Sequence, residues 1–200
     1  LLYILLIHEQ HDLPTQYICD SALISKIPSG GYPMSNMFCF QCQQTAHNEK
    51  CNGKAGVCGK KSDTAKAQDE LIGALIGLAK AAECGTPTDS TDRLVLKGLF
   101  TTITNVSFNT KTVNELTAEV EDEKRKICKS KVDNYELSRL WEASDDIRSL
   151  KSLILFGIKG MAAYAYHALA LGKADSEVNS FFYTALRAIE GESDPDKLLG

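Results

Sequence analysis

The sequence predicts an all-α protein: a helical bundle with an N-terminal cysteine-rich loop that binds a metal cluster. Three observations support this prediction. Four cysteines lie close together at Cys39, Cys42, Cys51 and Cys58. From Ser62 onward, apolar residues recur at helical spacing. No convincing strand pattern appears, so the core is expected to lie between helices.

Composition limits the possible functions. The 200 residues, 44% of them hydrophobic, allow one or two domains with a buried core. The net charge of −4 gives no electrostatic footprint for nucleic acid. No apolar run reaches the roughly 18 residues that span a bilayer. We therefore expect neither nucleic acid nor a membrane as a partner.

Residues 1–36 differ in character from the rest of the chain. LLYILLI is apolar but short, lacks a basic leading segment and is followed at once by HEQHD, so it makes a poor signal peptide. The chain starts with Leu1, and its first methionine is Met34. We interpret this segment as a non-native or disordered extension, and an added targeting or oligomerisation arm is the alternative.

Residues 37–62 form the cysteine loop, with the spacing C-x2-C-x8-C-x6-C. A pair two residues apart can turn both thiolates toward one metal centre, and two more cysteines complete a four-thiolate set. This pattern favours an iron–sulfur cluster. Structural zinc is an alternative, although the second pair fits a zinc knuckle poorly. Disulfides are a third, although seven cysteines without a signal peptide suggest a reducing compartment.

Residues around the cysteines suit such a cluster. Gly53, Gly56 and Gly59 would let the backbone wrap closely around sulfides and compensate their negative charge with N–H groups. Phe38 and Phe40 flank the first cysteine. They would either shield the cluster from water or pack into the core.

Residues 63–200 are expected to form the helical bundle. Ser62 or Asp63 can cap a first helix that runs to about Cys84 and stops at Gly85. A loop with a new cap follows at 87–92. A second helix then carries an apolar stripe, formed by Leu96, Leu99, Phe100, Ile103 and Val106.

Three more helices complete the prediction. A third starts near Thr112 and exposes its charge run EDEKRK (121–126) to solvent. The fourth and longest starts near Asp145 and ends at Gly172, and the fifth covers about 175–190. In the fourth, small residues form a stripe that another helix could approach closely; these are Gly157, Gly160, Ala162, Ala163 and Ala165.

From Met37 onward the chain resembles the hybrid-cluster proteins, also called prismane proteins or hydroxylamine reductases. The stretches that carry the resemblance are MFCFQCQQTA (37–46), GVCGK (56–60), LFTTITNVSFN (99–109) and SDDIRSLKSLILFGIKGMAAYAYHALALG (144–172). It implies a helical N-terminal domain whose four cysteines bind the proximal cluster. That cluster is [4Fe–4S] in the shorter-spaced group, which the x8 gap resembles, and [2Fe–2S] in another group.

The resemblance also implies an activity. Family members reduce hydroxylamine to ammonia, and nitric oxide reduction is also attributed to them. Catalysis there takes place at a hybrid iron–sulfur–oxygen cluster whose ligands lie in later domains, so we assign no catalytic residue. We expect an electron-entry part of a cytoplasmic oxidoreductase of nitrogen metabolism, inactive by itself, with a ferredoxin or an NADH-dependent reductase as electron donor. The alternative is a stand-alone electron-transfer module without activity.

Four other residues are given lesser roles. Cys84 and Cys128 have no matching partner in the sequence and are interpreted as ordinary thiols. His167 is interpreted as a hydrogen-bonded core histidine. His47 is interpreted as a solvent-facing residue of the cysteine loop.

Overall fold

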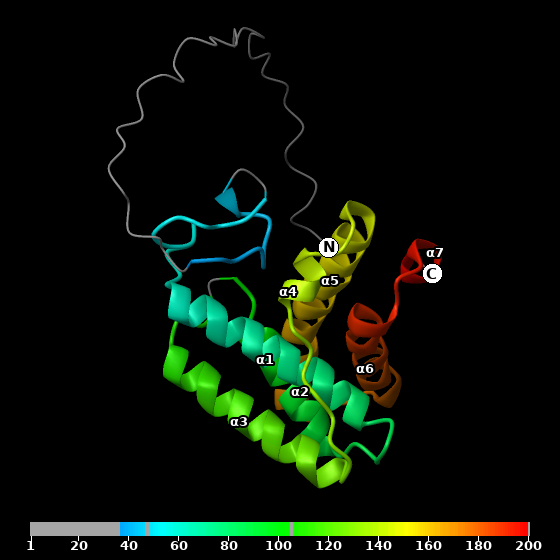
Figure 1. Ribbon diagram of the computed structural model, residues 1–200. Coiled ribbons are helices and arrows are strands. Elements are labelled where there is room, and N and C mark those ends of the chain that lie inside the picture. Colours follow the sequence, from blue (N-terminus) through cyan, green and yellow to red (C-terminus); the bar gives the residue numbers. More distant parts are fainter. Residues whose placement is uncertain (1–36, 47–48, 105, 200) are drawn as a thin grey trace, which may run out of the picture. The chain divides into compact units, whose positions relative to one another are not determined.

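A computed structural model describes residues 37–46, 49–104 and 106–199 (Figure 1). The predicted segment 1–36 and His47 lie outside these residues. In the described part, helices follow one another without a strand. They are α1 (Ser62–Ala81), α2 (Asp89–Thr101), α3 (Thr110–Ile127), α4 (Ser138–Trp141), α5 (Asp145–Ala170), α6 (Ser176–Gly191) and α7 (Pro195–Leu199). The predicted all-α class is therefore confirmed.

Helix α1 is the central element of the bundle. It packs most extensively against α3, and also against α6 and α2, while α2 and α6 both pack on α5 (Figure 1). Apolar side chains follow one another along α1 on several faces, and many have no solvent exposure; these are Leu71, Ile72, Leu75, Ile76 and Leu78. A helix that is apolar nearly all round is expected to be surrounded by others.

Glycines of α1 allow the chain after α3 to lie directly on the helix. The Gly73 carbonyl accepts a hydrogen bond from the Tyr135 amide at 3.2 Å. A Cβ atom on Gly73 would be 2.2 Å from the Tyr135 carbonyl oxygen. The predicted close approach at Gly157 and Gly160 is wrong for the described residues, because a Cβ on either glycine would meet nothing within 4 Å.

Helix ends depart from prediction by a few residues. Lys61, rather than Ser62 or Asp63, precedes the first turn of α1, without a side-chain cap bond. Helix α2 starts after a capping box between Thr88 and Thr91, and it ends at Thr101. The predicted continuation through Ile103 and Val106 is therefore wrong. The short helices α4 and α7 were not predicted.

The charge run of α3 is only partly solvated. Glu123 and Lys124 are buried. Thr91 donates a hydrogen bond to Glu123 at 2.8 Å, and Lys124 donates to Glu121 and Asn134. The prediction of a fully exposed run fails because Thr91 and Asn134, which lie outside α3, form hydrogen bonds with these two side chains.

Helices α5 and α6 match their predicted ranges. Helix α5 is followed by Gly172 at a φ of +71°, which suits a helix end. By length and composition it is also apolar enough to cross a membrane, contrary to the sequence-based expectation. This is weak evidence for a span, because core helices of soluble proteins can have the same length and composition. Lys159 lies within α5 and is buried against the protein.

Candidate metal centre

Two of the four predicted ligands are joined through the backbone. Cys39 and Cys51 form an isolated antiparallel bridge, in which the Cys39 amide donates to the Cys51 carbonyl at 3.0 Å and the Cys51 amide donates back at 2.7 Å. Both side chains are buried, whereas Cys42 and Cys58 are half-buried. The bridge closes the loop and fixes its first and third cysteines as neighbours.

A tight turn carries the fourth cysteine. The Gly56 amide donates to the Lys60 carbonyl at 2.8 Å, and the Gly59 amide donates to the Gly56 carbonyl at 2.8 Å. Gly59 has a φ of +85°, which residues with a Cβ rarely adopt. A Cβ on Gly56 would lie 3.4 Å from the Cys58 sulfur, so this glycine keeps the backbone close to the thiol. The turn also brings Lys60, at its end, next to the first cysteine of the loop.

Lys60 is a buried cation in contact with the first cysteine. It is only 2% exposed. Its ammonium Nζ lies 3.9 Å from the Cys39 Sγ and also donates to the Gln68 side-chain oxygen. Burial raises the pKa of the Cys39 thiol above its usual range, and the Lys60 charge opposes that rise. The nearby cation therefore favours the thiolate form, which is the form that ligates metals.

Lys159 of α5 is a second buried lysine in contact with the loop. Its Nζ donates to the Gln41 side-chain oxygen at 2.6 Å, and the Gln41 amide donates to Asp69 at 2.6 Å. Burial lowers the pKa of Lys159 to about 7, with Lys60 adding to this effect. Burial likewise raises the pKa of Asp69 to about 6. Buried lysines normally need compensating negative charge, and the cysteine pair Cys39 and Cys42 lies on either side of Gln41.

Aromatic side chains support the loop from the bundle. Trp141 lies 5.5 Å from Phe38 and 5.2 Å from Phe40, between ring centroids. Phe40 is part of the bundle core, and Phe38 packs against that core. Both phenylalanines therefore pack in the core, the second of the two roles considered for them.

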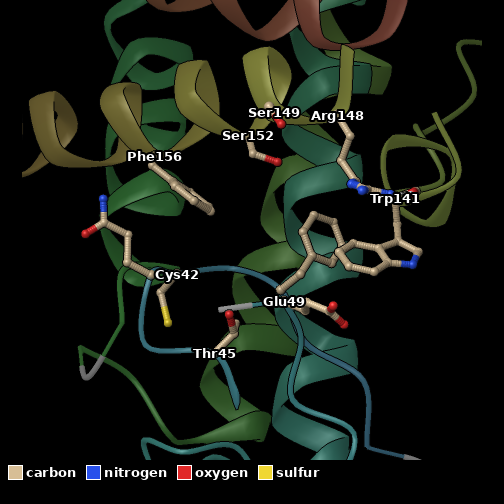
Figure 2. A pocket seen from close by; sticks show the side chains of 10 residues that line it. Cys42, Thr45, Glu49, Trp141, Arg148, Ser149, Ser152 and Phe156 are labelled. Carbon is tan, nitrogen blue, oxygen red and sulfur yellow. Dashed lines mark hydrogen bonds between the residues drawn. The ribbon is translucent and has the colours of Figure 1, made fainter. Parts of the chain in front are cut away.

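An open pocket of about 470 Å³ separates the loop from α5. Cys42 and Thr45 line the loop side, whereas Ser152 and Phe156 line the helix side (Figure 2). Cys42 also lines a neighbouring pocket together with Lys159. The second predicted ligand thus has free space beside it.

The sulfur atoms are not gathered as a finished ligand set. Across residues 37–46, 49–104 and 106–199, no three cysteine, histidine or carboxylate side chains lie together as a metal site. The chemistry of the donor set nevertheless fits an anionic cluster, because four free thiols share one loop and two buried ammonium groups lie against it. We conclude that the loop has the donors and the countercharge for such a group.

The other predicted residues lie elsewhere. Cys84 follows α1 and Cys128 follows α3. Hydrogen bonding to Cys128 raises the pKa of the Cys84 thiol, so these two are neighbours, which no pattern in the sequence indicates. His167 is exposed and contacts Phe100 edge-on at 5.5 Å, so its assignment to the core is wrong. Gly53 makes no close approach that requires a glycine.

The sequence did not point to the buried lysine and glutamine side chains that lie around the cysteine loop. One signal was present: Lys159 interrupts the apolar run ILFGIKGMAAYA of α5. A lysine in such a run is either exposed or held by buried partners. Gln41 and Gln68 gave no comparable signal.

The fold and the loop define a class of protein: a helical domain that carries four free thiols on one N-terminal loop. A match to the Prismane/CO dehydrogenase family covers residues 37–199. The chain belongs to this family, which implies iron–sulfur chemistry. The match starts at Met37, where the resemblance in the sequence also starts.

Similar proteins are named hydroxylamine reductase. The one from Desulfovibrio desulfuricans is 41% identical over 180 residues, covering 76% of this chain and 33% of the relative. The one from Caldanaerobacter subterraneus subsp. tengcongensis is 38% identical over 189 residues, covering 78% of this chain and 34% of the relative. The chain thus spans about a third of the length of the curated relatives it matches.

Proposed function

We propose that Cys39, Cys42, Cys51 and Cys58 hold an iron–sulfur cluster through which electrons enter a hydroxylamine reductase. The observation that carries the proposal is the four-thiol loop lying against two buried lysines, in a chain of the prismane family. The short x8 gap supports [4Fe–4S] over [2Fe–2S]. When bound, such a cluster supplies one-electron transfer.

The chain's own residues bind and position the group in this proposal. The Cys39–Cys51 bridge fixes one side of the loop, and the Gly56–Lys60 turn brings Cys58 to the other. The Val57 amide lies 3.5 Å from the Cys51 sulfur and donates to it, an interaction that stabilises a metal-bound thiolate. Trp141 packs against the two phenylalanines and so anchors the loop on the bundle.

The substrate and partners follow from the relatives. Their printed name supports hydroxylamine as substrate, and we extend the proposal to nitric oxide on the resemblance described above. A ferredoxin or an NADH-dependent reductase would deliver electrons in the cytoplasm. We place no catalytic residue in this chain, because the proposed role here is electron entry.

Anaerobic metal and sulfide analysis of the chain tests the proposal, with EPR spectra before and after dithionite. We expect about four irons and four sulfides per chain and a signal that appears on reduction. Two irons and two sulfides would replace the [4Fe–4S] assignment with [2Fe–2S]. Zinc, or no metal in anaerobically purified protein, would overturn the electron-entry role.

A further inference from the structure

We propose that Lys60 is a positioning residue that raises the reduction potential of the cluster, through an ammonium group held against Cys39 by Gln68. This inference rests on the proposed function, since it requires a cluster on the loop. It assigns a role to a residue that is not a ligand. Three features of the structure support it.

The first feature is the position of the charge. The Lys60 Nζ lies 3.9 Å from the Cys39 sulfur, which is within reach of an N–H···S hydrogen bond. At only 2% exposure, the side chain is shielded from solvent, so dissolved ions screen its charge weakly. A buried charge at this distance acts more strongly than one on the surface.

The second feature is the way in which the ammonium is held. Gln68 of α1 accepts a hydrogen bond from Lys60, and its amide donates to the Ser107 carbonyl at 2.9 Å. Gln68 is itself 1% exposed. The amide can therefore present only its oxygen to Lys60, which fixes the cation in place without cancelling its charge.

The third feature is the neutrality of this partner. The Asp69 carboxylate, which the Lys60 charge also reaches, is hydrogen-bonded to Gln41. A buried lysine is usually paired with a carboxylate, but the hydrogen-bond partners of Lys60 are an amide oxygen and a thiol. Its positive charge is therefore directed at the cysteine loop. One-electron reduction adds negative charge there, and a fixed cation stabilises the reduced state more than the oxidised state.

Lys60→Gln tests the inference in an electrode-poised spectroscopic titration, where the electrode supplies one electron and no bond changes. We expect the ratio of reduced to oxidised cluster at a fixed potential to fall about tenfold, which is a negative shift of about 59 mV. Lys60→Arg keeps the charge and should restore most of the ratio. Lys54→Gln removes an exposed charge from the same loop and should change the ratio little.

The outcomes separate the two proposals. Full iron and sulfide content with an unchanged ratio in Lys60→Gln would overturn the role of Lys60 and leave the proposed function intact. Absence of a cluster from the unmodified chain would overturn both. If Lys60→Gln does not retain iron, Gln68→Glu takes its place. It sets a carboxylate against the ammonium and should lower the ratio in the same direction, and an unchanged ratio there would also refute the inference.

Discussion

The cysteine loop and the interior of the bundle bury their side chains in opposite ways. Beneath the loop, Lys60, Lys159, Gln41 and Gln68 are all less than 5% exposed and form hydrogen-bonded chains. The middle of α1, by contrast, buries apolar side chains and brings its glycines against a neighbouring backbone. Burying the lysines beside the loop costs free energy unless an anionic group lies next to them, whereas the apolar interior of the bundle needs no added group.

This difference shows how a static structure can indicate a binding site before any ligand is present. An interior that needs no ligand satisfies its polar groups with its own partners. The loop instead combines the buried Lys60, the buried Lys159 with its pKa lowered to about 7, the half-buried Asp69 and four thiols. The surplus of positive charge there makes it the place for a negatively charged group.

The largest expected effect is on bound iron and sulfide, and it distinguishes a cysteine of the loop from a cysteine of the bundle. Cys42→Ala removes one of four proposed ligands and should abolish nearly all bound iron and sulfide, because the cluster needs four thiolates. Cys84→Ala changes a thiol at the end of α1 and should retain full iron content. Metal analysis of both variants, with circular dichroism to verify folding, makes the comparison. Full iron retention in Cys42→Ala would refute the ligand assignment.

A second change should act on the bundle and leave the loop unaffected. Gly73→Ala places a Cβ 2.2 Å from the Tyr135 oxygen. Relief of this clash displaces the backbone and weakens the Tyr135–Gly73 hydrogen bond, so the free energy of unfolding should fall by about 3 kcal/mol. Urea unfolding measures this change.

Gly157→Ala is the matched control for that substitution. Its Cβ would meet nothing within 4 Å, so the higher helix propensity of alanine should stabilise the chain by about 0.5–1 kcal/mol. Both variants, when folded, should bind as much iron as the unmodified chain. Equal stabilities of the two variants would contradict the backbone contact at Gly73.

Long amphipathic helices could be predicted from the sequence because residues typical of helix ends lie at their two termini. Helix α5 has acidic residues at its start and Gly172 after its end, and its observed range follows these signals. Helix α4 has only four residues, which is too short for a period to be recognised. Helix α2 ends at Thr101 although apolar residues continue at helical spacing, so apolar spacing alone does not reveal its end.

The ligand cysteines could be recognised from spacing, but the residues that support them could not. Lys159 is separated by 118 positions from its partner Gln41, and no local pattern links the two. Glu123 was expected in solvent because its partner Thr91 lies on another helix. Burial of polar side chains depends on such long-range partners, so it emerges only from the folded structure.

A smaller effect is expected in the pH dependence of the free energy of unfolding. It tests whether Lys159 is as deeply buried as the comparison of the loop with the bundle requires. Its pKa is about 7 in the folded chain and about 10.4 when unfolded. Between these values the unfolded chain binds more protons, so the free energy of unfolding of the iron-free chain should rise with pH, by up to about 1.4 kcal/mol per pH unit from this group. Asp69, with a pKa raised to about 6, acts below this window and with the opposite sign.

Urea unfolding of iron-free protein at about pH 7 and pH 8.5 measures this slope. Lys159→Met should lose most of it, whereas Lys66→Met, which changes an exposed lysine of α1, should keep it. A slope that persists in Lys159→Met would assign it to other groups. Lys159 would then stay charged in the folded chain over this pH range, contrary to its deep burial in the structure.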